Sequence, residues 1–362
     1  MTIRAVWVLL LVAGLAPALA QDEAAPAKAR PALIAPLAAK STMLGITLAG
    51  KRLVAVGQRG HILLSDNGKD WKQVEVPVNT MLNRVRFRDD KNGWAVGHDA
   101  SIVATADGGQ TWVLQHYDPE ARALYDVVFL DAERLAAVGA YGSYWSSADN
   151  GKTWEAKTFP IGELGQHFNA AVRLADGSLL IAGERGLLVR SRDNGENWEL
   201  LDSPYSGSFF GVLPYGDKGA IAYGLRGNIY TATDVSVSKA VDPASYDPFT
   251  RETVPDAQAL AKTGWAPLQQ RPTTEGLFGG ASDGATFLLV GVNGVAVRFD
   301  ATAGTAKLIK ASAETLNDVV RNGQGWLAVG RRGVLDLGNL DGTAGVAGGG
   351  DGTAGVAGGG EN

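Results

Sequence analysis

The chain contains no cysteine and only four histidines among its 362 residues. Disulfide bonds are therefore excluded, and the histidines lack the spacing of a zinc-ligand pair. The sequence also has no Walker-type phosphate loop and no Gly-x-Ser-x-Gly elbow. A formal net charge of -5 excludes a broad basic surface for nucleic acid. We expect no metal site, no cofactor and no nucleic-acid partner.

Long hydrophobic runs are absent after the first twenty residues. Residues 1–20 have the pattern of a signal peptide, with Arg4, an apolar segment over 5–15, and Ala18-Leu19-Ala20 before Gln21. No cysteine follows the apolar segment, which argues against a lipid anchor, and no later run reaches the roughly 18 residues of a membrane span. The sequence predicts export to the periplasm, with secretion as the alternative, and no direct membrane insertion.

Proline is scarce, with 14 residues, whereas glycine is abundant, with 48. Much of the glycine belongs to a repeated sequence pattern. In each repeat an apolar strand ends in Gly, two further residues and usually a second Gly follow, and a strand of alternating polar and apolar residues comes next. Its first glycine recurs at spacings of 39 to 44 residues, with one spacing of 67. These glycines are Gly57, Gly97, Gly139, Gly183, Gly224, Gly291 and Gly330. Four short strands per unit predict an all-β fold, a seven-bladed β-propeller of four-stranded antiparallel blades.

The repeats divide the chain into one propeller over 32–340, preceded by a flexible segment over 21–31 and followed by a Gly-rich tail over 341–362. The long spacing indicates an insertion at about 235–264, with a short helix over 256–262. The last unit lacks a fourth strand. We expect residues 32–37 to supply that strand and so close the ring.

Three units end their third strand in S/T-x-D-x-G-x-x-W, the Asp-box, and the first unit has the same spacing with Leu64 in place of the hydroxyl residue. The aspartate should accept backbone N–H groups, the glycine should adopt a positive φ, and the tryptophan should pack between sheets. We therefore predict structural roles for the aspartates and tryptophans of these turns. They are Asp66, Asp107, Asp149, Asp193, Trp71, Trp112, Trp154 and Trp198.

A longer phrase is more specific than the Asp-box. Val56-Gly57-Gln58-Arg59-Gly60, a turn ending Gly-x-Thr-Trp, and a next strand beginning Asn83-Arg84-Val85 together resemble the photosystem II stability and assembly-factor family of β-propellers. The resemblance covers about residues 32–340 and is clearest in the first four units. It implies a non-catalytic, seven-bladed scaffold that binds a membrane-protein complex on the non-cytoplasmic side, for which an envelope exporter is one candidate.

The turn between the second and third strands provides candidate partner-binding residues. Aligning the repeats places one position at Arg59, Asp99, Tyr141, Arg185, Arg226, Asn293 and Arg332, with Arg331 beside the last. By the resemblance, the family's arginine-rich surface would fall on these turns; structural hydrogen bonds to a neighbouring blade are the alternative.

The innermost strands place Arg84, Asp126 and Asp318 in a second ring, near the channel mouth. Arg84 is either part of a binding mouth or one partner of a charge pair that holds blades together. Whether a small-molecule ligand enters the channel is left open.

A secreted Asp-box glycoside hydrolase or carbohydrate-binding propeller is the alternative function. A sialidase needs an arginine triad, a tyrosine nucleophile and an acid/base aspartate, and the chain has no Arg-Ile-Pro segment of that type. We therefore predict that the protein is not an enzyme and name no catalytic residue.

Overall fold

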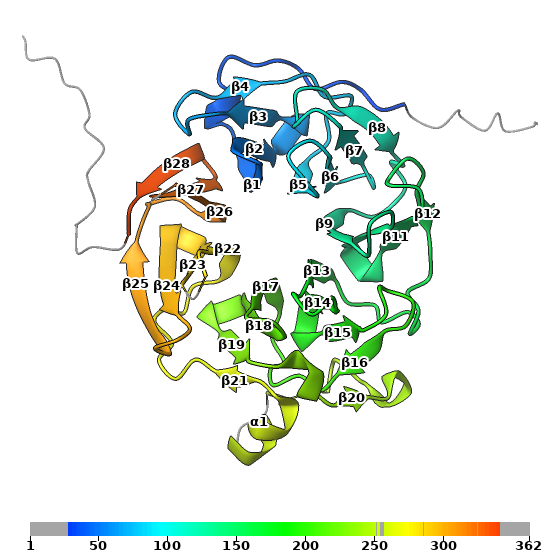
Figure 1. Cartoon of the computed structure of the whole chain (residues 1–362), viewed down its shortest axis with the longest axis vertical. Coiled ribbons are helices and arrows are strands. Elements are labelled where there is room, and N and C mark those ends of the chain that lie inside the picture. The colour runs from blue at the N-terminus through cyan, green and yellow to red at the C-terminus, as the bar shows by residue number, and fades with distance from the viewer. Residues whose placement is uncertain (1–27, 251, 254–256, 285, 324, 341–362) are drawn as a thin grey trace, which may run out of the picture.

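The computed structural model describes residues 28–340 apart from 251, 254–256, 285 and 324. The signal peptide, most of the N-terminal segment and the Gly-rich tail that we predict lie outside these described residues. Each repeat folds into an antiparallel sheet, and the seven sheets stand around a central axis as the blades of a propeller (Figure 1). The predicted architecture is confirmed.

The blades follow chain order, from the innermost strand outward. Blades one and two contain β1 (Met43–Ala49), β2 (Arg52–Gly57), β3 (Ile62–Ser65), β4 (Lys72–Gln73), β5 (Leu82–Phe87), β6 (Gly93–Gly97), β7 (Ile102–Thr105) and β8 (Val113–His116). Blades three and four contain β9 (Leu124–Phe129), β10 (Leu135–Gly139), β11 (Tyr144–Ser147), β12 (Glu155–Ala156), β13 (Phe168–Arg173), β14 (Leu179–Gly183), β15 (Leu188–Ser191) and β16 (Glu199–Leu201). Blades five to seven contain β17 (Phe209–Tyr215), β18 (Gly219–Gly224), β19 (Ile229–Ala232), β21 (Ala266–Pro267), β22 (Leu277–Ser282), β23 (Thr286–Gly291), β24 (Val295–Asp300), β25 (Thr305–Lys310), β26 (Leu316–Asn322), β27 (Gly325–Gly330) and β28 (Gly333–Gly338).

The core lies between neighbouring blades. Every residue of β6, β10, β14 and β18 is buried, because a second strand is covered by a blade on each face. This is why the second strands are continuous apolar runs, whereas the first strands, which face the channel, alternate more. Val96 and Ile102 of blade two, for example, pack with Val127 of blade three.

The first glycine of each repeat lies so close to another backbone segment that a side chain does not fit there. A Cβ on Gly57 would lie 2.4 Å from the carbonyl oxygen of Thr42, and a Cβ on Gly97 would lie 2.0 Å from that of Met81. The end of each second strand therefore rests directly on the backbone that enters the first strand. The glycine that defines the repeat in the sequence is the contact that sets the spacing of these two strands.

Each first strand begins with a β-bulge. The pairing register shifts at the same place in all seven blades, between Leu82 and Arg84 in blade two, for example. A bulge turns its extra side chain away from the regular alternation. The side-chain amide of the bulged residue Asn83 donates to the backbone carbonyl of Leu124 in blade three at 2.7 Å. The side chains of Asn169 and Asn317 make the same bond to the next blade.

The prediction for the N-terminal strand is wrong. Blade seven has three strands among the described residues, β26, β27 and β28, and residues 32–37 pair with none of them. The segment runs instead along the outer edge of blade one (dark blue in Figure 1), where the Ala32 amide donates to the carbonyl of Val76 at 2.9 Å. The side chain of Gln73 in β4 bonds the backbone of Leu33 and Ala35, and these contacts fix the segment beside blade one.

The junction of blades seven and one is closed by the residues just before β1. The 3-10 turn Ala38–Lys40 packs against β28. A Cβ on Gly333 would lie only 1.9 Å from the carbonyl oxygen of Ala39, so the two segments are in direct contact. In blade one the carbonyl of Val78, in the link to blade two, has the same relation to Gly60. The N-terminal segment thus replaces a linking loop, not a strand.

The insertion extends two blades. β20 (Ala240–Val241) pairs with β16 as a fifth strand of blade four, and α1 (Ala257–Thr263) precedes β21, which completes blade five. The guanidinium of Arg190, 2% exposed, donates to the carbonyls of Val235 and Ser238 and pairs with Glu199 at 2.7 Å, so it ties the insertion to blade four. Among the described residues no helix is long and apolar enough to cross a membrane.

Candidate binding face

The predicted turn residues form the apices of equivalent turns on one face of the ring. Strands alternate in direction, so the turns between second and third strands share a face with the links between blades, and the Asp-box turns lie on the opposite face. We call the face that carries the turns between second and third strands the turn face. Short 3-10 turns there include Gln58–Gly60, Ala140–Gly142, Glu184–Gly186, Leu225–Gly227 and Val292–Gly294.

The backbone at these apices is left-handed. The aligned residue has a φ of 52° to 58° in blades one to six, and it is Arg59, Tyr141, Arg185 or Arg226 in four of them. A left-handed conformation costs a non-glycine residue roughly 1–2 kcal/mol, less for Asn and Asp. Large side chains kept at strained positions indicate a constraint other than folding. Blade seven differs, since Arg331 and Arg332 precede Gly333, which takes the positive φ.

The turn residues have different surroundings. Arg59 and Arg226 are exposed, and Arg331 and Arg332 both face Glu314, at 3.9 and 3.2 Å. The guanidinium of Arg185 lies 4.4 Å from the ring centre of Phe249, an insertion residue. Among the described residues no ion pair engages Arg59, Arg185 or Arg226.

Tyr141 belongs to a separate aromatic group. It is 58% exposed, its ring centre lies 4.5 Å from that of His167, and its backbone amide donates to His167 Nδ1 at 2.9 Å. Arg122 stacks over the Tyr141 ring at 5.2 Å and donates to its carbonyl. The turn face therefore combines cationic and aromatic side chains.

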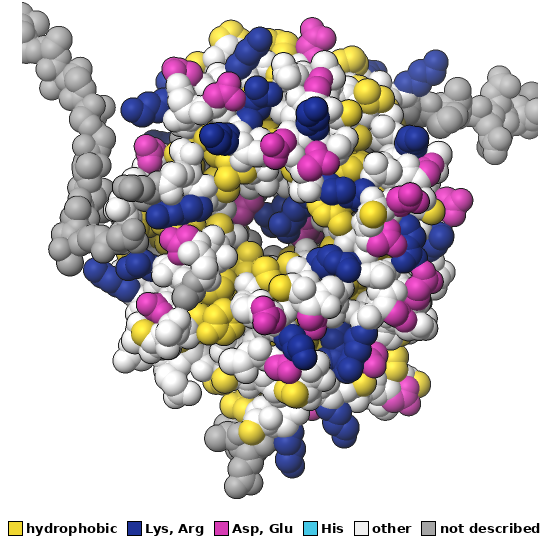
Figure 2. Space-filling view, in the orientation of Figure 1, with side chains coloured by type: hydrophobic (Ala, Val, Ile, Leu, Met, Phe, Trp, Pro, Cys, Tyr) yellow, Lys and Arg dark blue, Asp and Glu magenta, His cyan; other side chains and the backbone are white. Residues whose placement is uncertain are grey.

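Arg84 lies in the channel within a network of four charges. It pairs with Asp318 at 2.7 Å, and its Nε is 4.0 Å from Asp126. Arg86 makes two bonds to Asp126, at 3.0 and 2.8 Å. Charged side chains of both signs are visible inside the central opening (Figure 2). Because the charges of the four groups cancel, the geometry favours the charge-pair alternative for Arg84 over a binding mouth.

Burial and pairing oppose each other in this network. Burial raises the pKa of Asp126, but Arg86 and Arg84 outweigh it and hold that pKa below its usual value. Burial likewise disfavours the Arg84 cation, and Asp318 and Asp126 more than compensate, so the pKa of Arg84 rises. An aspartate that stays ionised cannot act as a proton donor at neutral pH. The adjoining cavity of about 190 Å³ is also lined by Tyr223, whose pKa burial raises.

The opposite face carries the Asp-box turns. In blade two Asp107 accepts the Thr111 amide at 2.9 Å and the Thr111 hydroxyl at 2.7 Å, and Trp112 Nε1 donates to the carbonyl of Gly109. Asp149 and Asp193 make the corresponding bonds in blades three and four. Hydrogen bonds from Thr153 lower the pKa of Asp149 to about 2, which keeps this exposed carboxylate ionised.

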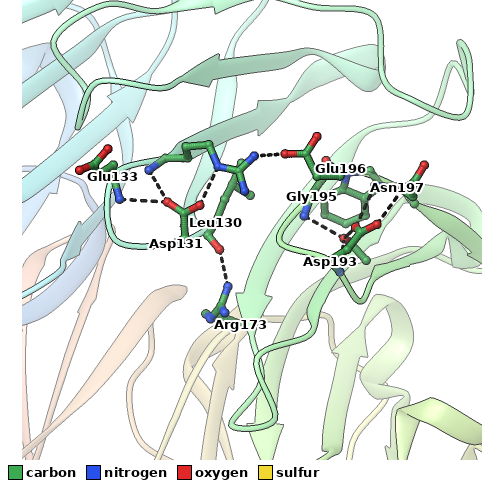
Figure 3. A network of polar contacts seen from close by, with 11 residues as sticks. Leu130, Asp131, Glu133, Arg173, Asp193, Gly195, Glu196 and Asn197 are labelled. Atoms are coloured by element: carbon green, nitrogen blue, oxygen red, sulfur yellow. Dashed lines mark hydrogen bonds and ion pairs between the residues drawn. The ribbon is translucent and has the colours of Figure 1, made fainter.

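Neighbouring blades are also joined on this face (Figure 3). Arg134 of blade three binds Asp131 and pairs with Glu196 in the Asp-box turn of blade four. Arg173 of blade four donates back to the carbonyl of Leu130. Burial opposes ionisation of Asp131, but hydrogen bonds from the Arg134 and Glu133 amides lower its pKa to about 2. The polar groups here are used within the scaffold.

Asp66 does not occupy the Asp-box position that we predict. The hydroxyl of Ser65 and the side-chain oxygen of Asn67 accept the turn amides, and Asp66 pairs with Arg52 at 2.9 Å. The physical reason is that the hydroxyl residue at the strand end is Ser65, one position later than Leu64. The turn is consequently one residue shorter, although Trp71 Nε1 still donates to the carbonyl of Gly68.

Sequence reasoning missed several residues of the turn face. Phe249, Arg122 and Arg271 occupy loops without an aligned counterpart, so the repeat gives no signal for them. Leu225 lies inside an aligned turn, directly before Arg226. Phe210 and Phe278, whose ring centres lie 5.3 Å apart, are bulged residues at the starts of β17 and β22. The Asn-x-Val phrase marks this position in blades two and seven and could have led to them. Among the described residues no three His, Asp or Glu side chains cluster as metal ligands.

The family model described as "Photosynthesis system II assembly factor YCF48" matches residues 64–123 and 118–242. Ycf48 of Thermosynechococcus vestitus is 30% identical over 202 residues, which are 54% of each chain. The Ycf48 lipoprotein of Prochlorococcus marinus is 31% identical over 165 residues, 45% of this chain and 49% of the relative. The chain thus matches about half the length of these curated relatives.

Solved structures show the same fold. A structure of YCF48 bound to D1 peptide has a TM-score of 0.61 at 16% identity, covering 85% of this chain and 96% of the other. The WD40 propeller domain of Doa1 has a TM-score of 0.56 at 10% identity, covering 86% and 96%. Repeat, blade structure and family match agree: the chain is a photosystem II assembly-factor-like β-propeller.

Proposed function

We propose that the protein is a non-catalytic, periplasmic assembly or accessory factor that binds a membrane-protein complex through the turn face. The observation that carries this proposal is the set of strained, unpaired arginines at Arg59, Arg185 and Arg226. Exposed guanidinium groups bind carboxylates bidentately and are frequent in protein interfaces. The similarity to YCF48, of which one solved form holds a D1 peptide, supports a membrane-protein partner.

Export is part of the proposal. It rests on the signal-peptide pattern of residues 1–20 and on relatives that are lipoproteins. This chain has no cysteine, and the proposal places its contact with a membrane complex on the turn face. An envelope exporter is one such complex.

The test replaces Arg59, Arg185, Arg226 and Arg332 by glutamate and measures capture of membrane proteins from detergent-solubilised envelopes of the native host. We expect capture to be lost while thermal unfolding changes little, since Arg59, Arg226 and Arg332 are exposed and Arg185 is half-buried, and exposed substitutions alter stability by roughly 0.5 kcal/mol or less each. The control makes the same charge change at Lys51, Lys69, Lys152 and Lys307, which are exposed and outside the turn face. Unchanged capture by the arginine variant would remove these residues from the site.

The glycoside-hydrolase alternative is tested on the same protein. We expect no turnover of sialosides or β-glucans, and Asp126, held ionised by Arg86 and Arg84, is not available as the general acid of such a reaction. Turnover that disappears in Asp318→Asn would overturn the scaffold proposal.

A further inference from the structure

The N-terminal segment runs along the outer edge of blade one (Figure 1), with a row of alanines on its inner side. Buried or half-buried side chains recur at every third position of residues 28–38, which holds Ala29, Ala32, Ala35 and Ala38. The first two pack into the core between blades one and two, and the last two into the core between blades seven and one. Three residues per turn is the period of a polyproline II helix, and Pro31 and Pro36 favour that backbone. The segment therefore turns its smallest apolar side chains toward the propeller.

The large apolar side chains of the same segment face solvent. Leu33 is 82% exposed, Ile34 58% and Leu37 66%. The other exposed large apolar side chains among the described residues are separated from one another in the sequence. Burying a leucine or an isoleucine is more favourable than burying an alanine, so packing alone would select the opposite arrangement. Exposed apolar side chains that gather in one place mark a contact surface.

The backbone that carries these side chains is fixed. The side chain of Gln73 donates to the carbonyl of Leu33 at 2.9 Å and accepts from the amide of Ala35 at 2.8 Å. At the end of the segment the amide of Lys40 donates to the carbonyl of Leu37 at 2.9 Å. A surface that is already held in one conformation loses less entropy on binding than a mobile one, so the exposed cluster is organised in advance.

Positive charge surrounds this cluster. Residues 24–65 contain no acidic residue, although the whole chain has a net charge of -5. The cations of the segment are exposed, and among the described residues none of them has an ion-pair partner; they are Lys28, Arg30 and Lys40. On the adjoining part of blade one, the exposed side chains of Lys72 and Glu75 offset each other. The segment thus combines an apolar cluster with a local excess of cations.

We propose that residues 28–40, which we call the N-terminal ridge, lie on the surface of a bilayer that contains anionic lipids. Leu33, Ile34 and Leu37 enter the boundary between headgroups and acyl chains, and the flanking cations bind lipid phosphates. Charge complementarity selects this occupant over a second copy of the chain, which would bring like charges together. The contact is peripheral: it needs no membrane-spanning segment and does not use the turn face.

The probes are extruded vesicles of phosphatidylcholine alone and of an equal mixture of phosphatidylcholine and phosphatidylglycerol. We expect the protein to sediment with the mixed vesicles and much less with the neutral ones, and high salt to weaken the binding. Affinity for the mixed vesicles should fall at least about 10-fold in the triple variant Leu33→Ser, Ile34→Ser, Leu37→Ser, and by a similar factor in Lys28→Gln, Arg30→Gln, Lys40→Gln. Thermal unfolding should change little, because all six side chains are exposed.

The matched controls carry the same substitutions at exposed positions outside the ridge, and neither should change vesicle binding. One replaces apolar side chains, Val113→Ser, Val237→Ser, Leu308→Ser, and the other replaces cations, Lys69→Gln, Lys152→Gln, Lys307→Gln. All variants retain residues 1–20 as in the wild type, so any contribution of that apolar segment to vesicle binding is equal in all of them.

Three results would overturn the ridge as a lipid-binding surface: no vesicle binding by the wild type, equal binding to neutral and mixed vesicles, or full affinity in the Leu33, Ile34, Leu37 variant. A wild-type dimer in light scattering that this variant loses would assign the ridge to a second copy instead. Capture of envelope proteins in detergent should be unchanged in the variant, because its turn face is intact. Loss of that capture would place a protein partner on the ridge and overturn the lipid contact as well.

Discussion

His61 connects the N-terminal segment to the first turn of the turn face. It is 4% exposed, and its Nδ1 lies 2.9 Å from the hydroxyl of Ser41, just before β1. Burial lowers the pKa of His61, and the charge of Arg59 lowers it further. The folded protein therefore favours the neutral imidazole at the junction of blades seven and one.

We predict a pH dependence of stability from this histidine. Its pKa in the folded state lies below the value of about 6.5 in the unfolded chain, so the unfolded state binds more protons between these two values. Stability should be complete above pH 6.5 and fall as the pH drops below it, by at most about 1.4 kcal/mol per pH unit for this group.

The measurement is guanidinium unfolding between pH 5 and 7.5, compared with His61→Gln. The variant should reduce the pH dependence without abolishing it, because burial also lowers the pKa of His116. Asp131 and Asp149, with pKa values of about 2, contribute nothing to the slope in this range. Equal slopes for the wild type and His61→Gln would contradict the assignment.

At the scale of elements, the insertion is held by a short strand and one buried cation. β20 is two residues long, and Arg190 supplies the bonds to Val235 and Ser238 on the segment that leads into it. A two-residue pairing is weak by itself. The guanidinium therefore adds to the packing of Val241 and Tyr246 against the core in holding the insertion on blade four.

We predict that Arg190→Met loosens the insertion before it affects the propeller. Hydrogen bonds from charged groups contribute about 1.5–3 kcal/mol each, so local opening should become much easier. Limited proteolysis should cut between residues 242 and 253 faster than in the wild type. Arg192→Met is the control, since Arg192 is 55% exposed, reaches Glu199 at 3.5 Å and makes one exposed bond to the segment, to the carbonyl of Ser236 at 3.4 Å, so its removal should matter less. Equal cleavage rates in the two variants would show that Arg190 does not hold the segment.

At the scale of the whole molecule, the channel charges close the ring along its axis. Arg84 of blade two reaches past blade one to Asp318 of blade seven, and Asp318 accepts the amide of Ile46 in blade one. Asp126 accepts amides of blades three and four and binds Arg86 of blade two. Two aspartates thus connect five consecutive blades, from seven to four.

We predict that Arg84→Met destabilises the propeller by about 3–5 kcal/mol, because it leaves Asp318 buried without its cation. The double variant Arg84→Met, Asp318→Asn should recover a large part of this loss, as expected for directly coupled residues. Chemical unfolding of the wild type, both single variants and the double variant gives the coupling energy. Additive losses would show that the pair does not act as one unit.

The repeat period made the architecture predictable because each structural unit carries its own spatial requirement. Gly57 and its equivalents cannot be larger, and the second strands must be apolar on both faces, so these features recur in the sequence. The two errors concern places where the repeat is broken. Residues 32–37 are hydrogen-bonded to Gln73 and Val76 of blade one. In the first Asp-box turn, Ser65 and Asn67 accept the backbone amides in place of Asp66.

Residues of the candidate site could be predicted only at positions that align between the repeats. Arg59, Arg185 and Arg226 align with one another, and their turns are equivalent in the structure. Phe249 gains its position from the path of the insertion, which brings it to Arg185, a contact between distant parts of the chain. No local pattern encodes such contacts.

The unequal residues at the left-handed apices have a consequence for orientation. A ring with seven identical turns would offer a partner seven equivalent rotations about the axis, whereas this ring has arginine, aspartate, tyrosine and asparagine at those positions. Choosing one of seven equal rotations corresponds to RT ln 7, about 1.1 kcal/mol, a difference that one charge-assisted hydrogen bond can supply. For a partner that binds the turn face as proposed, the unequal turns would favour one rotation about the axis over the other six.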